Sequence, residues 1–201
     1  METATPAPPT LIHLPDSFVE QLDLEKLFPV RQPLEVELGS GDGSFLAQWA
    51  KLNPQTNFFG VERLLGRLRK LDRKGRRAGL ENLRVMRIEA SYFVEFLLPP
   101  ASVSALHIYF PDPWPKRKHR KNRLVNEAFT EITAQSLVPG GIVYLRTDDL
   151  DYFQQMTAVF GANQKFQLVE TPAKLQAVLT DFERGFLARG VQTNRAAYRK
   201  V

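Results

Sequence analysis

The run from Phe110 to Arg123 combines residue types that suit chemistry on a nucleic-acid base. It begins Phe-Pro-Asp-Pro-Trp-Pro, and these three prolines fix φ at about −65° and remove backbone donors. Asp112 and Trp114 are therefore predicted to lie on a stiff loop. The following residues, Lys116–Arg123, include six lysines and arginines. A fixed carboxylate beside dense positive charge favours base chemistry, and the alternative is a surface turn next to a solvated charge run.

A second motif, Glu37-Leu38-Gly39-Ser40-Gly41-Asp42-Gly43, follows an apolar run and opens a helical pattern. Glycines such as Gly39 and Gly41 let the backbone turn sharply and let a nucleotide-like cofactor approach closely. The spacing is G-x-G-x-G, and Ser44 stands where the dinucleotide pattern has its third glycine. Pyrophosphate binding is therefore disfavoured.

Three carboxylates near this turn suit an adenosine cofactor. Glu62 closes the next predicted strand, where an acid accepts both ribose hydroxyls. Glu37 would attract the cationic methionine portion of S-adenosylmethionine and repel a pyrophosphate, although it could also be a surface strand residue. Glu89, after the third strand, either accepts the adenine amine or caps a helix N-terminus. A ribose acid does not by itself separate NAD from S-adenosylmethionine, and it is Glu37 that favours S-adenosylmethionine.

Short apolar runs alternate with amphipathic segments from Leu34 onward, which is typical of βαβ units around a mostly parallel sheet. The fold class is therefore predicted to be α/β. The predicted strands are Leu34–Leu38, Asn57–Val61, Leu83–Ile88, Ala105–Phe110, Ile142–Arg146 and Phe166–Val169. The predicted helices are Gly43–Leu52, Arg63–Ala78, Leu124–Leu137 and Leu150–Phe160. Pro139-Gly140-Gly141 is interpreted as a breaker before the fifth strand.

Composition sets limits on the protein class. The chain has 201 residues and a net charge of +5, with eight cations clustered between Arg63 and Arg77. That cluster is either a patch for polyanions or the solvated face of a helix. The absence of cysteine excludes disulfides and thiolate chemistry. No spacing suggests a metal site, no apolar run is long enough for a membrane span, and no signal peptide is recognised, so a soluble cytoplasmic protein is expected.

The chain is expected to divide once along its length. Residues 1–30 form an N-terminal segment that is predicted to be partly flexible, with a low-bulk tail at residues 3–10. Residues 31–201 form one domain. His107 lies in an apolar strand and is predicted to be a satisfied core residue.

Several of these motifs together resemble the bacterial tRNA (guanine-N7)-methyltransferase family. The resemblance covers about Leu34 to Ala188, and the block from Phe110 followed by the late Thr180–Gly185 block is specific to it. The family usually has an aspartate where Glu89 stands, and usually an arginine where Asn122 stands. The resemblance implies a Rossmann-like class I S-adenosylmethionine-dependent methyltransferase domain, with a mostly parallel central sheet flanked by helices.

The resemblance also implies a reaction and a set of site residues. Such enzymes form 7-methylguanine at guanine 46 in the variable loop of tRNA. The expected partner is tRNA, with no membrane, and the sequence leaves a monomer or a homodimer open. The implied cofactor contacts are Glu37, Gly39, Gly41, Glu62, Glu89 and Asp112, with Asp112 also the catalytic residue. The implied substrate contacts are Lys116, Asp148, Thr180 and Glu183.

The chemistry of guanine is compatible with these residues. N7 carries a free lone pair and no proton, so methyl transfer needs no general base, and Asp112 is predicted to stabilise the positive charge that develops on the ring. Guanine offers N1–H and an amine as donors, which suits Asp148 or Glu183 as readers. Trp114 either stacks on a base or packs within the turn.

Two other functions remain open from the residues alone. One is a different enzyme, either an NAD-dependent oxidoreductase or a methyltransferase acting on an exocyclic amine. The other is a non-catalytic RNA-binding module with a vestigial cofactor pocket.

Overall fold

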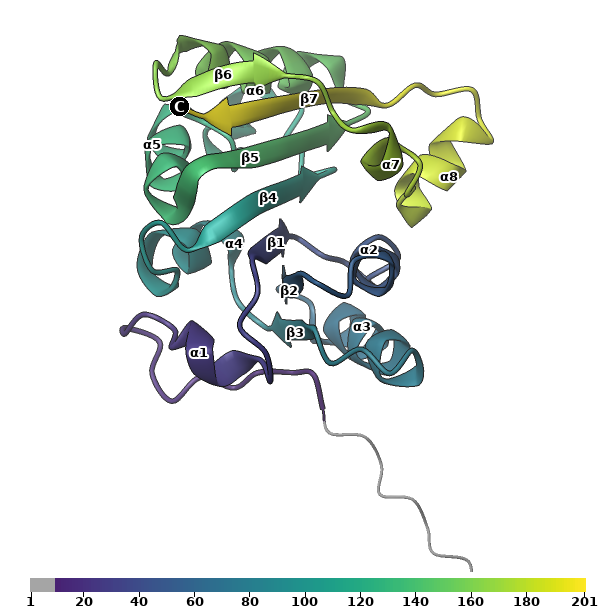
Figure 1. The fold of residues 1–201 in the computed structure, drawn as a ribbon. Coiled ribbons are helices and arrows are strands. Elements are labelled where there is room, and N and C mark those ends of the chain that lie inside the picture. Colours follow the sequence, from purple (N-terminus) through teal and green to yellow (C-terminus); the bar gives the residue numbers. More distant parts are fainter. Residues whose placement is uncertain (1–9) are drawn as a thin grey trace, which may run out of the picture.

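Seven strands form one sheet in the computed structural model, which describes residues 10–201 (Figure 1). The order across the sheet is β3-β2-β1-β4-β5-β7-β6. The strands are β1 (Leu34–Leu38), β2 (Asn57–Val61), β3 (Leu83–Met86), β4 (Val103–Tyr109), β5 (Leu137–Thr147), β6 (Phe166–Val169) and β7 (Asn194–Lys200). Strand β7 is antiparallel to β5 and β6, and the pairings among β1 to β5 are parallel. The predicted α/β class with a mostly parallel sheet is confirmed.

Helices cover both faces of the sheet (Figure 1). One face carries α2 (Leu46–Leu52), α3 (Leu65–Arg77) and α7 (Ala173–Gln176), with α8 (Asp181–Leu187) following α7. The other face carries α1 (Leu24–Leu27), α4 (Ala90–Tyr92), the π-helical turn η1 (Phe93–Leu97), α5 (Glu127–Ser136) and α6 (Leu150–Ala162). A 3₁₀ segment, η2 (Arg117–Asn122), follows the proline-rich loop. Each face therefore has its own apolar core, as expected when both sides of a parallel sheet are covered.

The strand order places the candidate site at one edge of the sheet. The chain runs outward from β1 through β2 to β3, and then crosses to β4 on the other side of β1. In such a sheet, ligands bind beyond the carboxyl ends of the strands at the point where the order reverses. The turn after β1, Glu62 after β2, and the loops after β4 and β5 all lie at this edge.

The predicted bounds of β1, β2 and β6 are confirmed, and β5 differs from prediction. Pro139-Gly140-Gly141 does not break the chain before the strand, because these residues lie inside β5. The register passes from Val103 opposite Leu137 to Ala105 opposite Ile142, so the extra residues bulge out of the ladder. Gly140 has φ +77°, which glycine adopts without strain. The four predicted helices are present, three of them with shorter bounds and α6 with a slightly longer one.

The N-terminal segment binds along the free edge of β3. Ile12 forms a parallel bridge with Val85, and Leu11 is buried against the position of Gly75 in α3. Asp72 accepts hydrogen bonds from Thr10 Oγ1 (3.0 Å) and from the Leu11 amide (2.8 Å). The segment thus protects an edge strand that would otherwise be open. The rest of the predicted tail, residues 3–9, lies outside the described residues, and the division at residue 30 stays a prediction.

Within residues 10–201, none of the helices combines the length and apolar composition that crossing a bilayer requires.

Candidate functional site

The glycine-rich turn after β1 leaves open space above its backbone. Gly39, Gly41 and Gly43 have φ of +78°, +56° and +78°, a conformation that side chains with a Cβ rarely adopt. A Cβ on Gly39 or Gly41 would meet no atom within 4 Å, whereas one on Gly43 would lie 2.1 Å from Leu71 Cδ1. The first two glycines therefore face a space that a ligand can enter. The third allows the turn to pack against α3.

Glu37 is a buried acid with an unpaired oxygen at this turn. The residue is 3% exposed, and its Oε2 has no hydrogen-bond partner among the described residues. Burial raises the pKa of Glu37 to about 8; Arg146 opposes this shift, and Glu62 and Asp42 add to it. An unsatisfied buried carboxyl group is costly unless a ligand completes it. A cationic ligand would supply the missing partner for the Glu37 carboxyl group, so the residues fit the predicted sulfonium cofactor.

Glu62 is held by backbone amides on both of its oxygens. Its Oε2 accepts from the Gly41 amide (3.0 Å), and its Oε1 accepts from the Leu64 amide (2.7 Å). Each carboxylate oxygen has a second lone-pair direction that these bonds leave free. The carboxylate is therefore fixed at the end of β2 and can accept further hydrogen bonds, as a ribose diol requires.

Glu89 caps a helix in this structure. Its oxygens accept from the amides of Ser91 (3.0 Å) and Tyr92 (2.8 Å) at the start of α4. Of the two alternatives for Glu89, the capping role is thus observed. The adenine contact stays a prediction.

The loop after β4 carries Asp112 on a strained backbone. Phe110 and Trp114 have φ of +51° and +43°, which is unusual for side chains of this size. The Phe110 amide donates to the Arg146 carbonyl (2.8 Å), so the loop starts at the neighbouring strand β5. Asp112 is exposed and has no hydrogen bond to the residues described. Its carboxylate is therefore available to a ligand.

Arg123 holds this loop in place. Its side chain is 1% exposed and donates to the Pro113 carbonyl (2.7 Å), to Gln155 Oε1 (2.8 Å) and to Asp151 Oδ2 (2.5 Å). Its guanidinium also lies 4.7 Å from the ring centre of Tyr152. Arg123 is therefore not one of the surface cations that the basic run Lys116–Arg123 predicts, because its side chain is buried. Its partners on α6 are about 30 residues away in the chain, so no local pattern reveals them.

The remaining cations of this run divide into paired and unpaired side chains. Arg120 Nη2 forms an ion pair with Asp151 Oδ1 (2.9 Å). Four cations of this run are exposed and form no ion pair with the described residues: Lys116, Arg117, Lys118 and Lys121. Trp114 is 36% exposed, and its ring meets His119 edge-on at 5.9 Å. Both packing and an exposed ring surface are thus observed for Trp114.

Thr180 and Glu183 form a capping box at the start of α8. Thr180 Oγ1 accepts from the Glu183 amide (3.0 Å), and Glu183 Oε2 accepts from the Thr180 amide (2.9 Å). Glu183 is 0% exposed and also accepts from Arg146 Nη1 (2.8 Å) and Arg195 Nη2 (2.8 Å). Its observed role is to attach α8 to β5 and β7. Substrate contacts by Thr180 and Glu183 stay predictions.

Arg146 is a site residue to which the sequence analysis gave no role. Its side chain is 1% exposed, and its guanidinium lies 4.2 Å from the ring centre of Tyr109. It donates to the Val178 carbonyl (2.8 Å) and the Leu175 carbonyl (2.7 Å), besides Glu183. Its position as a charged residue at the end of an apolar strand is the sequence signal that could have identified it.

The start of α8 also contacts the glycine-rich turn. The Asp181 amide donates to Ser44 Oγ (2.9 Å), and Lys74 Nζ lies 3.2 Å from Asp42 Oδ2 and 4.0 Å from Asp181 Oδ2. Asp148, in contrast, is exposed after the end of β5. The structure thus brings most of the predicted residues to one edge of the sheet, on β1, β2, β4, β5 and α8.

His107 is a core residue, as predicted. It is 0% exposed, and its ring nitrogens lie 2.8 Å from the Tyr109 hydroxyl and 2.8 Å from Glu35 Oε2. Trp49 Nε1 donates to the same Glu35 oxygen (2.8 Å). This buried network joins β1, β4 and α2 below the site.

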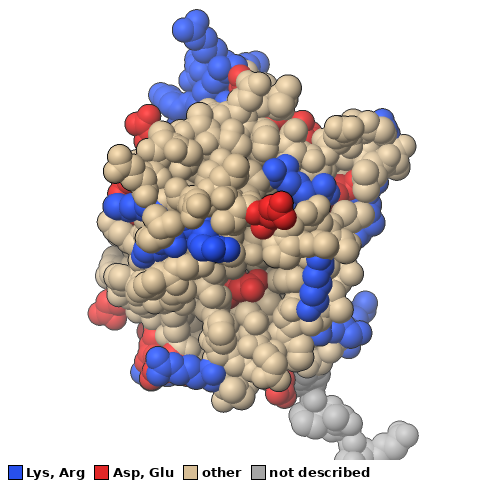
Figure 2. Space-filling model, turned by 45° about the horizontal axis from the view of Figure 1, so that its top comes forward, with Lys and Arg blue, Asp and Glu red and all other residues tan. Residues whose placement is uncertain are grey.

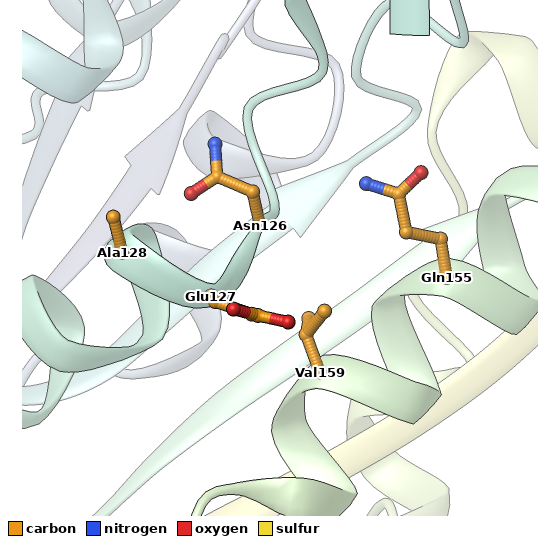
Figure 3. A pocket seen from close by; sticks show the side chains of 5 residues that line it. All are labelled: Asn126, Glu127, Ala128, Gln155 and Val159. Atoms are coloured by element: carbon orange, nitrogen blue, oxygen red, sulfur yellow. The ribbon is translucent and has the colours of Figure 1, made fainter. Parts of the chain in front are cut away.

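A shallow groove of about 380 Å³ lies elsewhere, between α5 and α6 (Figure 3). It is lined by Asn126, Glu127, Ala128, Gln155 and Val159. None of these is a predicted site residue. The groove is connected to the site through Gln155, which accepts a hydrogen bond from Arg123.

The surface charge is grouped rather than mixed. In Figure 2 lysine and arginine side chains form separate groups, one of which projects from the top, while acidic side chains lie in the middle of the face. Cationic ligands are favoured at the buried acids, and polyanions are favoured at the basic groups.

Comparisons with known proteins agree with this geometry. A family model described as "Putative methyltransferase" matches residues 31–196. A tRNA (guanine-N(7)-)-methyltransferase of Halorhodospira halophila is 35% identical over 191 residues, covering 89% of this chain and 79% of that protein. One from Geobacter metallireducens is 33% identical over 192 residues, covering 93% of this chain and 91% of that protein.

Solved structures confirm the fold. The 16S rRNA methyltransferase KamB superimposes with a TM-score of 0.62 at 16% identity, covering 90% of this chain and 94% of that chain. The geranyl diphosphate C-methyltransferase of Streptomyces coelicolor, solved with S-adenosyl-L-homocysteine, has a TM-score of 0.53 at 12% identity, covering 89% and 74%. The predicted Rossmann-like class I methyltransferase fold is confirmed. The match to the methyltransferase family, rather than these solved structures, supports S-adenosyl-L-methionine as the cofactor.

The buried carboxyl group of Glu37 predicts a pH-dependent stability. Between pH 4.5 and about 8 the unfolded chain has released this proton and the folded chain keeps it, so the free energy of unfolding falls as pH rises. Glu37→Gln is expected to remove this contribution, so its stability relative to the wild type increases with pH. Urea denaturation of both proteins across this range measures the effect. If the free energies of unfolding of the two proteins changed with pH in parallel, Glu37 would have the same pKa in the folded and unfolded states.

The contacts of Arg123 predict a loop that opens when they are lost. In Arg123→Ala the proline-rich loop loses its buried anchor, and trypsin is expected to cleave faster after the exposed cations of η2. Mass spectrometry of the first fragments measures the rate. Arg117→Ala also removes one cleavage site but leaves the anchor, so it is the matched control. Equal initial rates in the two variants would rule out the anchoring role.

Proposed function

Because the chain belongs to the tRNA (guanine-N7)-methyltransferase family, we propose that it forms 7-methylguanine at guanine 46 in the variable loop of tRNA. The observation that carries this proposal is the loop after β4. It holds an exposed, unpaired Asp112 at the cofactor edge of the sheet and continues directly into the unpaired cations of η2. The loop thus joins the acid to an RNA-binding surface.

Five residues of this chain are suited to hold the cofactor, which supplies an electrophilic methyl group when bound. Gly39 and Gly41 leave room for it above the turn. Glu37 offers an unpaired carboxyl oxygen to its positive charge, and a cation at this position favours the ionised form of the group. Glu62 offers free lone pairs to a ribose diol. Glu89 is the proposed partner of the adenine.

Positioning, rather than proton transfer, is what the protein must supply. Guanine N7 has a lone pair and no proton, so no residue has to act as a general base. Holding the reactants in line can contribute roughly 7–11 kcal/mol. The anchor formed by Arg123 and the backbone link from Phe110 to β5 both limit the movement of the loop that faces the purine.

Asp112 has an electrostatic role in this proposal. Methyl transfer places positive charge on the purine ring, and a carboxylate fixed nearby stabilises that charge. The Asp112 side chain forms no hydrogen bond or ion pair with residues 10–201, which leaves it able to contact the base and the cofactor. It is the proposed catalytic residue.

Asp148 is the best available reader of guanine. It is exposed at the end of β5, next to the strand that carries the Asp112 loop. A carboxylate accepts hydrogen bonds from guanine N1–H and the amine, a pattern that adenine does not offer. Glu183 is fully committed to Arg146, Arg195 and Thr180, so its proposed contribution is to place α8 beside the bound substrate. Lys116 is the proposed phosphate contact nearest the loop.

The proposal includes the setting of the reaction. Residues 31–201 act as the methyltransferase domain, in the cytoplasm, as a monomer or a homodimer.

The product and its position test the proposed function directly. Wild-type protein incubated with S-adenosylmethionine and an unmodified tRNA transcript is expected to form 7-methylguanine, and a transcript with adenine at position 46 is expected to remain unmethylated. Nuclease digestion followed by mass spectrometry identifies the nucleoside and its position. A methylated exocyclic amine, or methylation of both transcripts, would contradict the proposal.

Replacing Asp112 by Asn tests its role. The variant keeps the shape of the side chain and loses the charge, so kcat for methyl transfer is expected to fall about 100-fold or more. The affinity for tRNA is expected to change less than about twofold, because phosphate contacts dominate it. Single-turnover kinetics and filter binding measure the two quantities. Equal losses in both would mean that Asp112 serves the structure of the loop.

A further inference from the structure

The outer face of α3 carries a row of cations that the proposed site does not use. In this helix Leu68, Leu71, Asp72 and Gly75 are buried. At 3.6 residues per turn, the opposite face carries Arg67, Lys70, Arg73 and Arg77. Together with Arg63, which comes just before the helix, we call these residues the α3 basic stripe. All five residues are exposed.

The stripe has no counter-charge among residues 10–201. The other cations of the cluster include Lys74, which is paired with Asp42, and Arg76, which is paired with Asp72. The five stripe side chains form no ion pair within the described part of the chain. Like charges three and four residues apart on a helix repel each other. A row of such charges fits an extended polyanion better than it fits a single acidic group.

The stripe begins at the cofactor pocket. The Leu64 amide, next to Arg63, donates to Glu62 Oε1 (2.7 Å), so the acid at the end of β2 also holds the start of α3. From there the helix passes the glycine-rich turn, because Leu71 packs at Gly43 and Lys74 pairs with Asp42. At about 1.5 Å per residue, the distance from Arg67 to Arg77 along the helix is roughly 15 Å. Arg63 is therefore the end of the stripe nearest to Glu62, and Arg77 is the end farthest from it.

The stripe and the η2 cations lie on opposite sides of the pocket. The stripe follows β2, and η2 follows the loop after β4, with β1 between these two strands. Strands β2 and β4 themselves are two strand spacings apart, which is roughly 10 Å. When a base of an RNA strand enters between the stripe and the η2 cations, each of these two basic surfaces can bind phosphates of that RNA. Figure 2 shows basic side chains along the right-hand side, the side on which α3 lies in Figure 1.

We propose that the α3 basic stripe binds the phosphate backbone of tRNA outside the variable loop. This inference rests on the proposed function for the identity of the RNA, and it adds a second contact surface to that site. The contact is with phosphates rather than bases, so it contributes affinity and orientation without sequence preference. The partner is the body of the folded RNA, because the stripe extends well beyond the pocket.

Neutralising two charges of the stripe tests the proposal. The full chain carrying Arg73→Gln and Arg77→Gln is compared with one carrying Lys51→Gln and Arg199→Gln. Lys51 and Arg199 are exposed cations at the amino edge of the sheet, opposite the pocket. Both variants lose two positive charges. Circular dichroism and calorimetric binding of S-adenosylhomocysteine verify that both are folded.

The affinity for an unmodified tRNA transcript is measured by filter binding over a range of salt concentrations. The stripe variant is expected to bind about tenfold or more weakly, and the slope of log K against log salt is expected to fall by roughly 1.4–1.8, the value for two lost phosphate contacts. The control is expected to match the wild type. Equal affinities and slopes in the two variants would overturn the proposal and leave the stripe to an acidic protein partner or to solvent.

Binding is measured without turnover, so this result does not depend on which atom of the RNA is methylated. A wild-type protein that binds tRNA through the stripe but forms no 7-methylguanine would contradict the proposed function alone.

Discussion

The site depends on a buried carboxyl group, one oxygen of which has no hydrogen-bond partner within residues 10–201. Glu37 lies at the carboxyl end of β1, beside the acids Glu62 and Asp42, and Arg146 is the opposing charge that lowers its pKa. Concentrating acids in a buried pocket destabilises the free protein, because burial disfavours their ionised forms. A positively charged ligand reverses this penalty. The pocket therefore selects a cation before any hydrogen bond to its adenosine is considered.

Two buried arginines connect this pocket to the elements that face the RNA. Arg146 links β5 to α8 through Glu183, and Arg123 links the Asp112 loop to α6 through Asp151 and Gln155. Each arginine uses several donors in a fixed plane, a geometry that lysine cannot reproduce. Both arginines hold structural elements together, and neither is available to bind RNA. This is why only part of the positive charge in the motifs is free to bind phosphate.

The sequence was sufficient for features that local patterns encode. Apolar runs gave β1, β2 and β6 with correct bounds, and the glycine-rich turn and Glu62 were placed at the correct edge. Contacts between distant residues were not accessible in this way. Arg123 and Arg146 bind groups 28 to 37 residues away, so their charges looked like surface charges. Strand β7 was missed because Arg195, Arg199 and Lys200 interrupt any simple alternation of apolar and polar residues. The bulge in β5 likewise depends on pairing with β4.

The separation of charges explains how one site serves two ligands of opposite sign. The acids lie in the pocket and at the strand ends, and the unpaired cations lie on η2 and α3 at either side of it. If cations lined the pocket, they would compete with the cofactor for Glu37, and if acids lined the flanks, they would repel phosphate. The net charge of +5 is small because it is the sum of these two opposed regions, and their arrangement rather than their total determines what the protein binds.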